Sequence, residues 1–258
     1  MERCLQLARK GEGYTLPNPM VGAVIVHHNR IIGEGYHRQY GKAHAEVNAI
    51  MAVKEKALLT DSTLYVSLEP CSHQGKTPPC TGLIIARNIP RVVVAVKDPN
   101  PIVSGRGIGI LKEQGVEVAV GTLETGAREL NRIFFVNQQY KRPFVILKWA
   151  QSKDHFMDYV RTSLQEKTPA VISNRLTQTL VHKIRTQAQG ILVGTRTAML
   201  DNPRLTARKW YGQHPVRIVI DRENKIPATS ALFDGTTATI VFTATVRTDL
   251  PNKGIKQI

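Results

Sequence analysis

The sequence predicts two α/β domains joined near residue 143, and three observations support this. Strand-like and helix-like segments alternate along most of the chain, which is typical of layered α/β sheets. With 258 residues, the chain exceeds the usual size of one domain. A strand-like run at 144–149 follows a long predicted helix, so Arg142-Pro143 is the best boundary.

Apolar spacing and turn residues assign the elements of residues 1–143. The Pro78-Pro79 pair directly before Cys80 favours a helix that starts there, and Asp98 to Pro101 forms a turn. The predicted elements are helices over 2–10, 43–57, 80–87, 108–113 and 124–139 and strands at 21–26, 31–36, 63–67, 92–96 and 116–120.

The second predicted domain, residues 144–258, repeats the α/β pattern without repeating the sequence. Its predicted strands lie at 144–149, 190–193, 216–221 and 238–242, with a helix over 174–185. Gly105 to Gly109 follows no strand directly, so we interpret it as a turn into a helix rather than a dinucleotide-binding loop.

Composition narrows the class of protein but not its ligand. Hydrophobic residues make up 42% and charged residues 21% of the chain, as in an ordinary globular protein. No run approaches the roughly 20 apolar residues of a membrane span, and the first residues do not resemble a signal peptide, so we expect a cytoplasmic protein. The net charge of +15 suits nucleic acids, phosphorylated metabolites and NADPH equally.

The three cysteines favour metal binding over disulfides. Their number is odd, and Cys71 and Cys80 follow a His-x-Glu sequence. A catalytic zinc ion uses three protein ligands with water in the fourth position, and His44, Cys71 and Cys80 are a sufficient set. Glu46 lies two residues after His44, where its carboxylate can move protons to and from that water.

The order of these residues matches most of a known signature. Zinc deaminases carry H-x-E followed by P-C-x-x-C, and His44-Ala45-Glu46 and Pro70-Cys71 fit it. The second cysteine departs from it, because Cys80 comes nine positions after Cys71 rather than three. Two alternatives stay open: a structural zinc site with His73 as a fourth ligand, and no metal.

These motifs resemble the bifunctional deaminase and reductase family of riboflavin biosynthesis, along essentially the whole chain. The resemblance rests on Pro17-Asn18-Pro19, His44-Ala45-Glu46, the segment Leu68 to Cys80, and Asp98-Pro99-Asn100-Pro101. It implies a cytidine-deaminase-like three-layer α/β/α domain over residues 1–143. A partial dihydrofolate-reductase-like domain over residues 144–258 then follows.

The resemblance also implies a reaction and its cofactors. The substrate would be 2,5-diamino-6-ribosylamino-4(3H)-pyrimidinone 5′-phosphate, deaminated at its 2-amino group with Zn²⁺. The reductase half would reduce the ribose of 5-amino-6-(5-phosphoribosylamino)uracil with NADPH. By motif, the residues implied to hold the deaminase substrate are Asn18, His37, Lys76, Asp98 and Asn100; Lys76 offers a point charge to phosphate.

In the second domain, Ile191 to Gly194 and Asp201 to Arg208 resemble the reductase of this family. The residues implied near the ribose phosphate are Lys148, Arg185, Leu205 and Arg208, and those implied near NADPH are Gln151, Thr197 and Asp201. The family also implies a homo-oligomer with small-molecule substrates and with neither nucleic-acid nor membrane partners.

The chain departs from the family in two ways. Asp154-His155 stands where the family commonly has Asp-Gly, and histidine adopts a positive φ less readily than glycine. The sequence also ends at Ile258, before the family's later reductase segments. We therefore expect these 258 residues to deaminate without measurable reduction.

The main rival hypothesis is a nucleic-acid deaminase of the tRNA type, which shares the zinc chemistry and suits the positive charge. The long segment between Cys71 and Cys80 argues against it, as does the absence of an aromatic-rich basic strand pattern for stacking bases. A catalytically inactive structural subunit is the third alternative.

Overall fold

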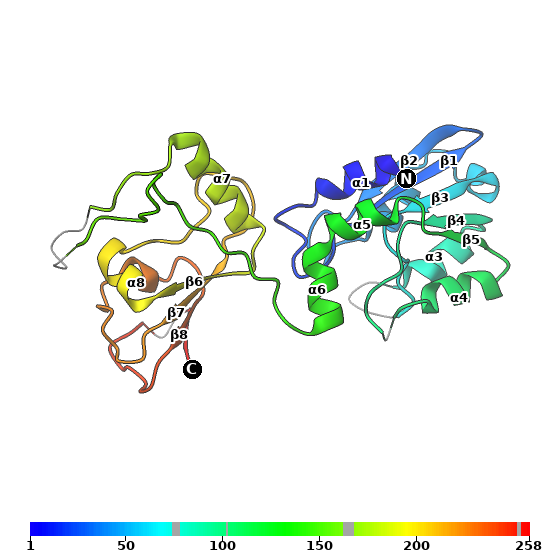
Figure 1. Ribbon diagram of the computed structural model, residues 1–258. Coiled ribbons are helices and arrows are strands. Elements are labelled where there is room, and N and C mark those ends of the chain that lie inside the picture. Colours follow the sequence, from blue (N-terminus) through cyan, green and yellow to red (C-terminus); the bar gives the residue numbers. More distant parts are fainter. Residues whose placement is uncertain (74–77, 102, 162–167, 252–253) are drawn as a thin grey trace. The chain divides into compact units, whose positions relative to one another are not determined.

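The computed structural model describes residues 1–258 except 74–77, 102, 162–167 and 252–253. The chain forms two compact units, Met1–Val145 and Ile146–Ile258 (Figure 1). Within the described residues, every helix is too short or too polar to cross a membrane.

Unit 1 is built on a mixed sheet with the strand order β2-β1-β3-β4-β5. Strand β1 is antiparallel to both β2 and β3, whereas β3, β4 and β5 run parallel. The strands are β1 Gly22–His27, β2 Arg30–Tyr36, β3 Thr63–Val66, β4 Arg91–Val94 and β5 Glu117–Val120.

Helices cover both faces of this sheet and give the predicted three layers. Helices α2, α3 and α4 form one layer, and α1 and α5 form the other. Strand residues alternate between the layers: Ala23 and Ile25 join one core and Val24 the other. The helices are α1 Glu2–Arg9, α2 Ala45–Ala52, η1 Lys56–Asp61, α3 Cys80–Ala86, α4 Arg106–Glu113, α5 Glu124–Leu130 and α6 Arg132–Tyr140.

A glycine lets α2 approach the sheet closely. A Cβ atom on Gly35 of β2 would lie 2.3 Å from the backbone nitrogen of Ala49 and 2.5 Å from the carbonyl oxygen of Ala45. The close packing at Gly35 therefore holds the first turn of α2, which carries Glu46, against the sheet.

Two predicted helices of unit 1 differ in the structure. The helix expected over 43–57 ends at Ala52, and the 3₁₀ helix η1 follows it. The helix expected over 124–139 is divided at Asn131 into α5 and α6. The Asn131 side chain accepts a hydrogen bond from the Met20 N–H at 2.8 Å and donates one to the Met20 carbonyl at 2.9 Å. This tertiary bridge stands where the helix would have continued.

Unit 2 contains a parallel sheet with the order β6-β7-β8-β9. Its strands are β6 Gly190–Gly194, β7 Val216–Ile220, β8 Thr239–Phe242 and β9 Ile255–Gln257, and its helices are α7 Arg175–Thr186, α8 Thr195–Asp201 and η2 Ala231–Phe233. Sequence patterns predicted β6, β7, β8 and α7, but not α8 or the short β9.

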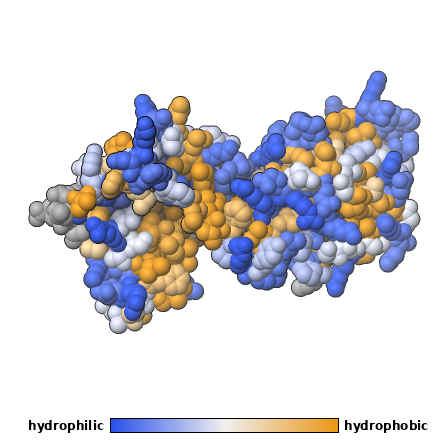
Figure 2. Space-filling view, viewed as in Figure 1, coloured by the Kyte–Doolittle hydropathy of each residue, from blue (hydrophilic) through white to orange (hydrophobic). Residues whose placement is uncertain are grey.

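The sheet of unit 2 is covered on one face. Val193, Val219 and Val241 point into its core, whereas the alternate residues Leu192, Ile220 and Phe242 are 57%, 42% and 40% exposed. Figure 2 shows apolar residues gathered on the surface of this unit. Parallel sheets normally bury both faces, so this surface is unusual.

The predicted strand at 144–149 is wrong. Residues 143–150 form no regular element, and the side chains of Val145, Leu147 and Trp149 are exposed. The apolar run Phe144 to Leu147 gives the segment strand propensity, but a strand also requires a partner for its backbone groups, and the segment pairs with none of the described strands.

Candidate active site

The three predicted ligands lie together in unit 1. His44 Nδ1 is 3.5 Å from Cys71 Sγ and 3.4 Å from Cys80 Sγ, and the three ligand atoms form a compact group. His44 is the N-cap of α2, Cys71 lies in the loop after β3, and Cys80 begins α3. One nitrogen and two sulfur donors at this spacing fit a tetrahedral zinc ion.

Hydrogen bonds favour the thiolate form of Cys71. A hydrogen bond from the Cys80 thiol, a second from His44 and a third from the Cys80 backbone N–H lower the pKa of Cys71 to about 4. The Cys80 N–H lies 3.3 Å from Cys71 Sγ. The donor set therefore supplies a thiolate, the form that binds metal.

Glu46 lies beside this group in the first turn of α2. The side chain is buried, and burial together with the negative charge of Cys71 raises the pKa of Glu46 to about 7. A carboxyl group with such a pKa can accept and return a proton near neutral pH.

A cavity of about 360 Å³ opens over Glu46, His44 and Cys71. Four of the five predicted substrate residues line it: Asn18, His37, Asp98 and Asn100. The fifth, Lys76, lies outside the described residues. The sequence motifs around Asn18, His37, His44, Cys71 and Asp98 thus meet at one cavity.

Asn18 and His37 form a short hydrogen-bonded chain at the cavity wall. His37 Nδ1 donates to the Ala43 carbonyl at 3.1 Å, and Asn18 Nδ2 donates to His37 Nε2 at 3.3 Å. Burial lowers the pKa of His37, which keeps this imidazole neutral. The orientation leaves the Asn18 oxygen as an acceptor for a ring N–H.

Glu69 organises the opposite side of the cavity. Its buried carboxylate accepts hydrogen bonds from the backbone N–H groups of Asp98, Gly105, Gly107 and Ile108, at 2.9 to 3.3 Å. Asp98 in turn accepts a bond from the Asn100 N–H at 2.8 Å, and burial raises the pKa of Asp98. Glu69 therefore joins the loop before Cys71 to the loop that carries Asp98.

Sequence reasoning missed several residues of the cavity wall. Tyr40 and Lys42 precede His44, and Phe134 and Gln138 come from α6. The spacing of Phe134 and Gln138, four residues apart, places both on one face of a helix. That spacing was the available signal, but it does not tell which surface the face meets.

In unit 2, predicted phosphate residues belong to a cationic cluster. Arg185 on α7 donates to the Thr206 carbonyl at 2.9 Å, while its buried Nε atom has no hydrogen-bond partner among the residues that the structure describes. Burial and the charge of Arg208 lower the pKa of Arg185. Burial, followed by the charges of Arg185, Arg208 and Lys209, lowers the pKa of His182 to about 4. Such a cluster suits an anion.

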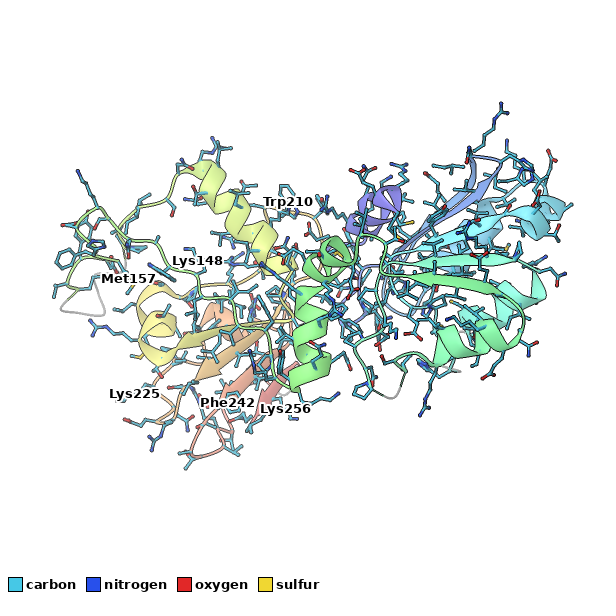
Figure 3. All side chains as sticks on the ribbon, turned by 45° about the vertical axis from the view of Figure 1, so that its right-hand side comes forward. Lys148, Met157, Trp210, Lys225, Phe242 and Lys256 are labelled. Carbon is cyan, nitrogen blue, oxygen red and sulfur yellow. The ribbon has the colours of Figure 1, made fainter. Side chains whose placement is uncertain are left out.

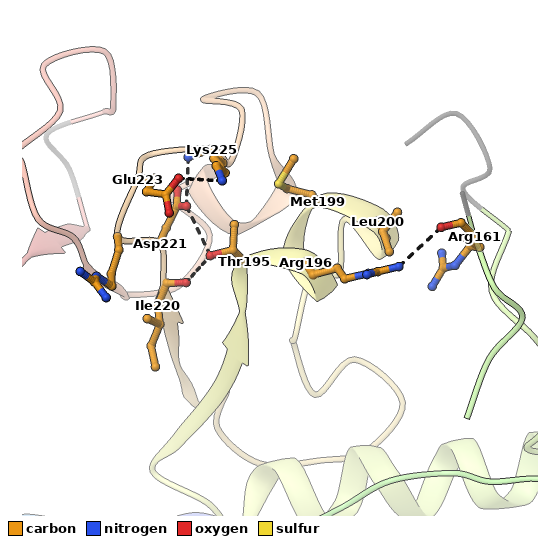
Figure 4. A pocket seen from close by; sticks show the side chains of 10 residues that line it. Arg161, Thr195, Arg196, Met199, Leu200, Ile220, Asp221, Glu223 and Lys225 are labelled. Carbon is orange, nitrogen blue, oxygen red and sulfur yellow. Dashed lines mark hydrogen bonds and ion pairs between the residues drawn. The ribbon is translucent and has the colours of Figure 1, made fainter. Parts of the chain in front are cut away.

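A second cavity, of about 540 Å³, lies at the carboxyl ends of β6 and β7 (Figure 4). Ligands of open α/β sheets bind at such ends. Thr195 donates to the Ile220 carbonyl at 2.6 Å, and the basic residues of the lining are Arg161, Arg196, Arg222 and Lys225. Sequence reasoning singled out none of these five polar residues.

The other predicted reductase residues do not belong to the lining of this cavity. Thr197 and Asp201 are on α8 outside the cavity lining, and Asp201 pairs with Arg161 at 2.7 Å. The Leu205 side chain lies in the core. The exposed residues Lys148 (Figure 3) and Gln151 lie in irregular chain, where Gln151 accepts from Trp149 Nε1 at 3.0 Å.

His155 adopts the positive φ that glycine would adopt more readily at this position. Its φ is +70°, in the left-handed region that glycine occupies most easily. Its N–H donates to the Ser152 carbonyl at 3.1 Å. Histidine tolerates this region better than most residues, so the turn is kept without glycine.

Comparison with known families divides the chain in the same manner. Residues 1–96 match the cytidine and deoxycytidylate deaminase zinc-binding region, and residues 143–254 match the RibD C-terminal domain. The first match contains His44, Cys71, Cys80 and Glu46.

Curated and solved proteins match along nearly the whole chain. The riboflavin biosynthesis protein RibD of Aquifex aeolicus is 44% identical over 94% of this chain and 67% of its own length, and that of Bacillus amyloliquefaciens is 44% identical over 95% and 64%. The chain thus spans about two thirds of these relatives.

A crystal structure from Thermotoga maritima, of a diaminohydroxyphosphoribosylaminopyrimidine deaminase/5-amino-6-(5-phosphoribosylamino)uracil reductase, is 39% identical with a TM-score of 0.89, over 100% of this chain and 72% of that one. Acinetobacter baumannii RibD is 33% identical with a TM-score of 0.90 over the same shares. With this identity and coverage, the chain belongs to the RibD family of riboflavin biosynthesis proteins.

Proposed function

We propose that unit 1 catalyses the zinc-dependent hydrolysis of the 2-amino group of 2,5-diamino-6-ribosylamino-4(3H)-pyrimidinone 5′-phosphate. The observation that carries the proposal is the position of buried Glu46 beside His44, Cys71 and Cys80, at a cavity lined by Asn18, His37, Asp98 and Asn100. The products are 5-amino-6-(5-phosphoribosylamino)uracil and ammonia.

The residues of the chain divide the chemical work. Zinc, when bound, supplies a Lewis acid that lowers the pKa of a water molecule to about 7. Glu46 takes the proton that this water releases and returns it to the departing amine. The raised pKa of Glu46, about 7, suits both transfers because neither protonation state is strongly favoured at neutral pH.

The cavity residues orient the pyrimidine ring. The Asn18 oxygen accepts from a ring N–H or amino group, and the neutral His37 fixes the Asn18 amide. Asp98 and Asn100 read the ring and ribose from the opposite side. Lys76 contributes positive charge to the phosphate.

Unit 2 would take the deaminated product and NADPH. The cluster of Arg185, Arg208 and His182 suits the ribose phosphate, and the resemblance to the family implies that Lys148 and Leu205 also contribute to this site. The cavity at β6 and β7 suits the cofactor, and the resemblance to the family implies that Gln151, Thr197 and Asp201 also contact it. The 2′-phosphate of NADPH matches the arginines that line this cavity.

The proposal extends to the whole protein. We propose that the protein works in the cytoplasm as a homo-oligomer. Its substrates are phosphorylated small molecules, and it does not act on nucleic acid. The exposed residues Leu192, Ile220 and Phe242 support an assembly, because water-exposed apolar patches of this kind mark contact surfaces.

One assay with two readouts tests both activities. The chain is incubated with the diaminopyrimidinone ribotide, and ammonia release is followed; the deaminated ribotide with NADPH is then supplied, and nicotinamide oxidation is followed. Ammonia release without added NADPH supports the deaminase assignment. Absence of ammonia from zinc-loaded protein would refute it, and the second readout decides the reductase assignment separately.

A further inference from the structure

A second group of metal-ligating side chains lies at the β1–β2 hairpin of unit 1. The carboxylate of Asp61, the last residue of η1, is 2.9 Å from His28 Nε2 and 3.6 Å from His27 Nε2. The three ligand atoms all lie within 4.8 Å of one another. Neither the deaminase nor the reductase chemistry uses this group.

The turn of the hairpin brings two consecutive histidines to one side. Successive side chains of a strand normally point to opposite faces. Here His28 and Asn29 have φ values of +45° and +59°, and they close the turn between the paired residues His27 and Arg30. The imidazole centroids consequently lie only 4.1 Å apart, and both rings reach Asp61.

The spacing suits a metal ion better than a hydrogen bond alone. Ligands bound at about 2.0–2.1 Å in a tetrahedron lie about 3.4 Å apart. The His44–Cys71 and His44–Cys80 distances, 3.5 and 3.4 Å, show this spacing in the same chain. A hydrogen bond between His28 and Asp61 explains their 2.9 Å distance, and the antiparallel pairing of Val26 with Thr63 brings His27 Nε2 within 3.6 Å of the same carboxylate.

We propose that His27, His28 and Asp61 bind a second divalent metal ion per chain. Imidazole nitrogen favours Zn²⁺, Ni²⁺ or Cu²⁺ over the oxygen-seeking Mg²⁺ and Ca²⁺, and water completes the coordination. The His28 and Asp61 side chains are 71% and 74% exposed, so the site is open to solvent. Arg30 adds a positive charge to the same turn, and binding is therefore weaker than at the cysteine site.

Bound metal would add a link beside the point where the sheet already pairs Val26 of β1 with Thr63 of β3. It would fix the hairpin turn to the end of η1, and any ligand that binds only the folded state stabilises it. The group is therefore a structural metal site that stabilises unit 1, and it is independent of the proposed deaminase activity.

The test is a titration of Zn²⁺ into protein that already carries one zinc at the cysteine site. Calorimetry should detect one further equivalent, and the melting temperature of unit 1 should rise with it. His28→Asn keeps the turn, because asparagine accepts a left-handed backbone, and Asp61→Asn keeps the side-chain shape. Each should weaken the second equivalent at least tenfold, since even the loss of outer-shell partners costs about 10–100-fold.

His155→Asn is the matched control, because it makes the same change at an exposed histidine with a φ of +70° in unit 2. It should leave the second equivalent unchanged. A wild-type chain that takes up only one zinc would overturn the proposal. So would a second equivalent that binds equally well to His28→Asn and Asp61→Asn.

Discussion

Opposing influences act on the side chains around His44. Burial favours a neutral Glu46 and raises its pKa, whereas hydrogen bonds favour a thiolate at Cys71 and lower its pKa. The two groups come from different parts of unit 1, Glu46 from α2 and Cys71 from the loop after β3. This separation of pKa values supports the proposed metal binding by the cysteine and the proposed proton transfer by the glutamate.

Replacement of either cysteine ligand should remove the metal. Cys71→Ser or Cys80→Ser leaves one sulfur and one nitrogen donor with a hydroxyl that ionises far less readily than a thiol, so zinc content should fall from about one per chain to near zero. Elemental analysis after dialysis measures it. Cys4→Ser is the control, because Cys4 is buried on α1 away from the cluster; full zinc retention in the Cys71 or Cys80 variants would contradict the ligand assignment.

At the scale of elements, Glu69 joins two loops that the active site needs. A Cβ on Gly107 would lie 2.1 Å from the Pro70 carbonyl oxygen. Helix α4 therefore lies so close to the loop before Cys71 that only glycine fits at position 107. Two oxygens of Glu69 satisfy four backbone N–H groups there. The carboxylate also complements the positive end of the α4 dipole.

Glu69→Gln should misplace Asp98 and Asn100 without removing zinc. Glutamine has one acceptor oxygen and one NH₂ group, so two of the four N–H groups lose their acceptor, at a cost of about 1.5–3 kcal/mol of unit 1 stability. KM should rise more than kcat falls, with about one zinc retained. Steady-state kinetics and zinc analysis check this.

Glu113→Gln, on the exposed end of the same helix, is the matched control and should behave as wild type. Equal loss of zinc and activity in Glu69→Gln would show that Glu69 supports only the fold. An unchanged KM would show that it does not position the substrate residues.

The sequence predicted elements well where local signals decide them. Pro78-Pro79 before Cys80 correctly predicted the start of α3. Gly105 has a left-handed backbone directly before α4, in agreement with the predicted turn into a helix. The predictions failed where distant contacts decide. Asn131 interrupts a helix by binding Met20, and residues 144–149 are a mostly apolar run without a partner among the described strands.

The candidate site follows the same division. Ligand chemistry is a property of residue type, so His44, Cys71, Cys80 and Glu46 were recognisable from their order. Phe134 and Gln138 line the cavity because the division at Asn131 sets α6. No local pattern carries that information, and the polar lining of the unit 2 cavity was missed for the same reason.

At the scale of the whole molecule, each unit has its own hydrophobic core. Unit 2 also buries one charged side chain completely, that of Arg217 in the sheet. It donates to Asp234 at 2.7 Å and to the carbonyls of Arg204 and Leu232. The Arg217 guanidinium holds the pKa of Asp234 well below its usual range.

Asp234→Asn should therefore destabilise unit 2 by about 1.5–3 kcal/mol at neutral pH. A lowered folded-state pKa contributes stability above the unfolded value of about 3.9 and loses it as pH falls through the folded value. The difference between wild type and variant should shrink below about pH 4. Urea unfolding at several pH values measures it.

The exposed pair Glu223 and Lys225 provides the control, since Glu223→Gln should cost little. A stability difference between wild type and Asp234→Asn that is independent of pH would contradict the role given to this carboxylate.

The central claim is that zinc at His44, Cys71 and Cys80 and proton transfer by Glu46 together deaminate the pyrimidinone ribotide. Ammonia release by wild type and by Glu46→Gln, with zinc content measured on the same samples, tests it most directly. We expect about one zinc in both proteins and a loss of at least about 10²-fold in the variant's rate. Undiminished ammonia release by zinc-loaded Glu46→Gln would contradict it.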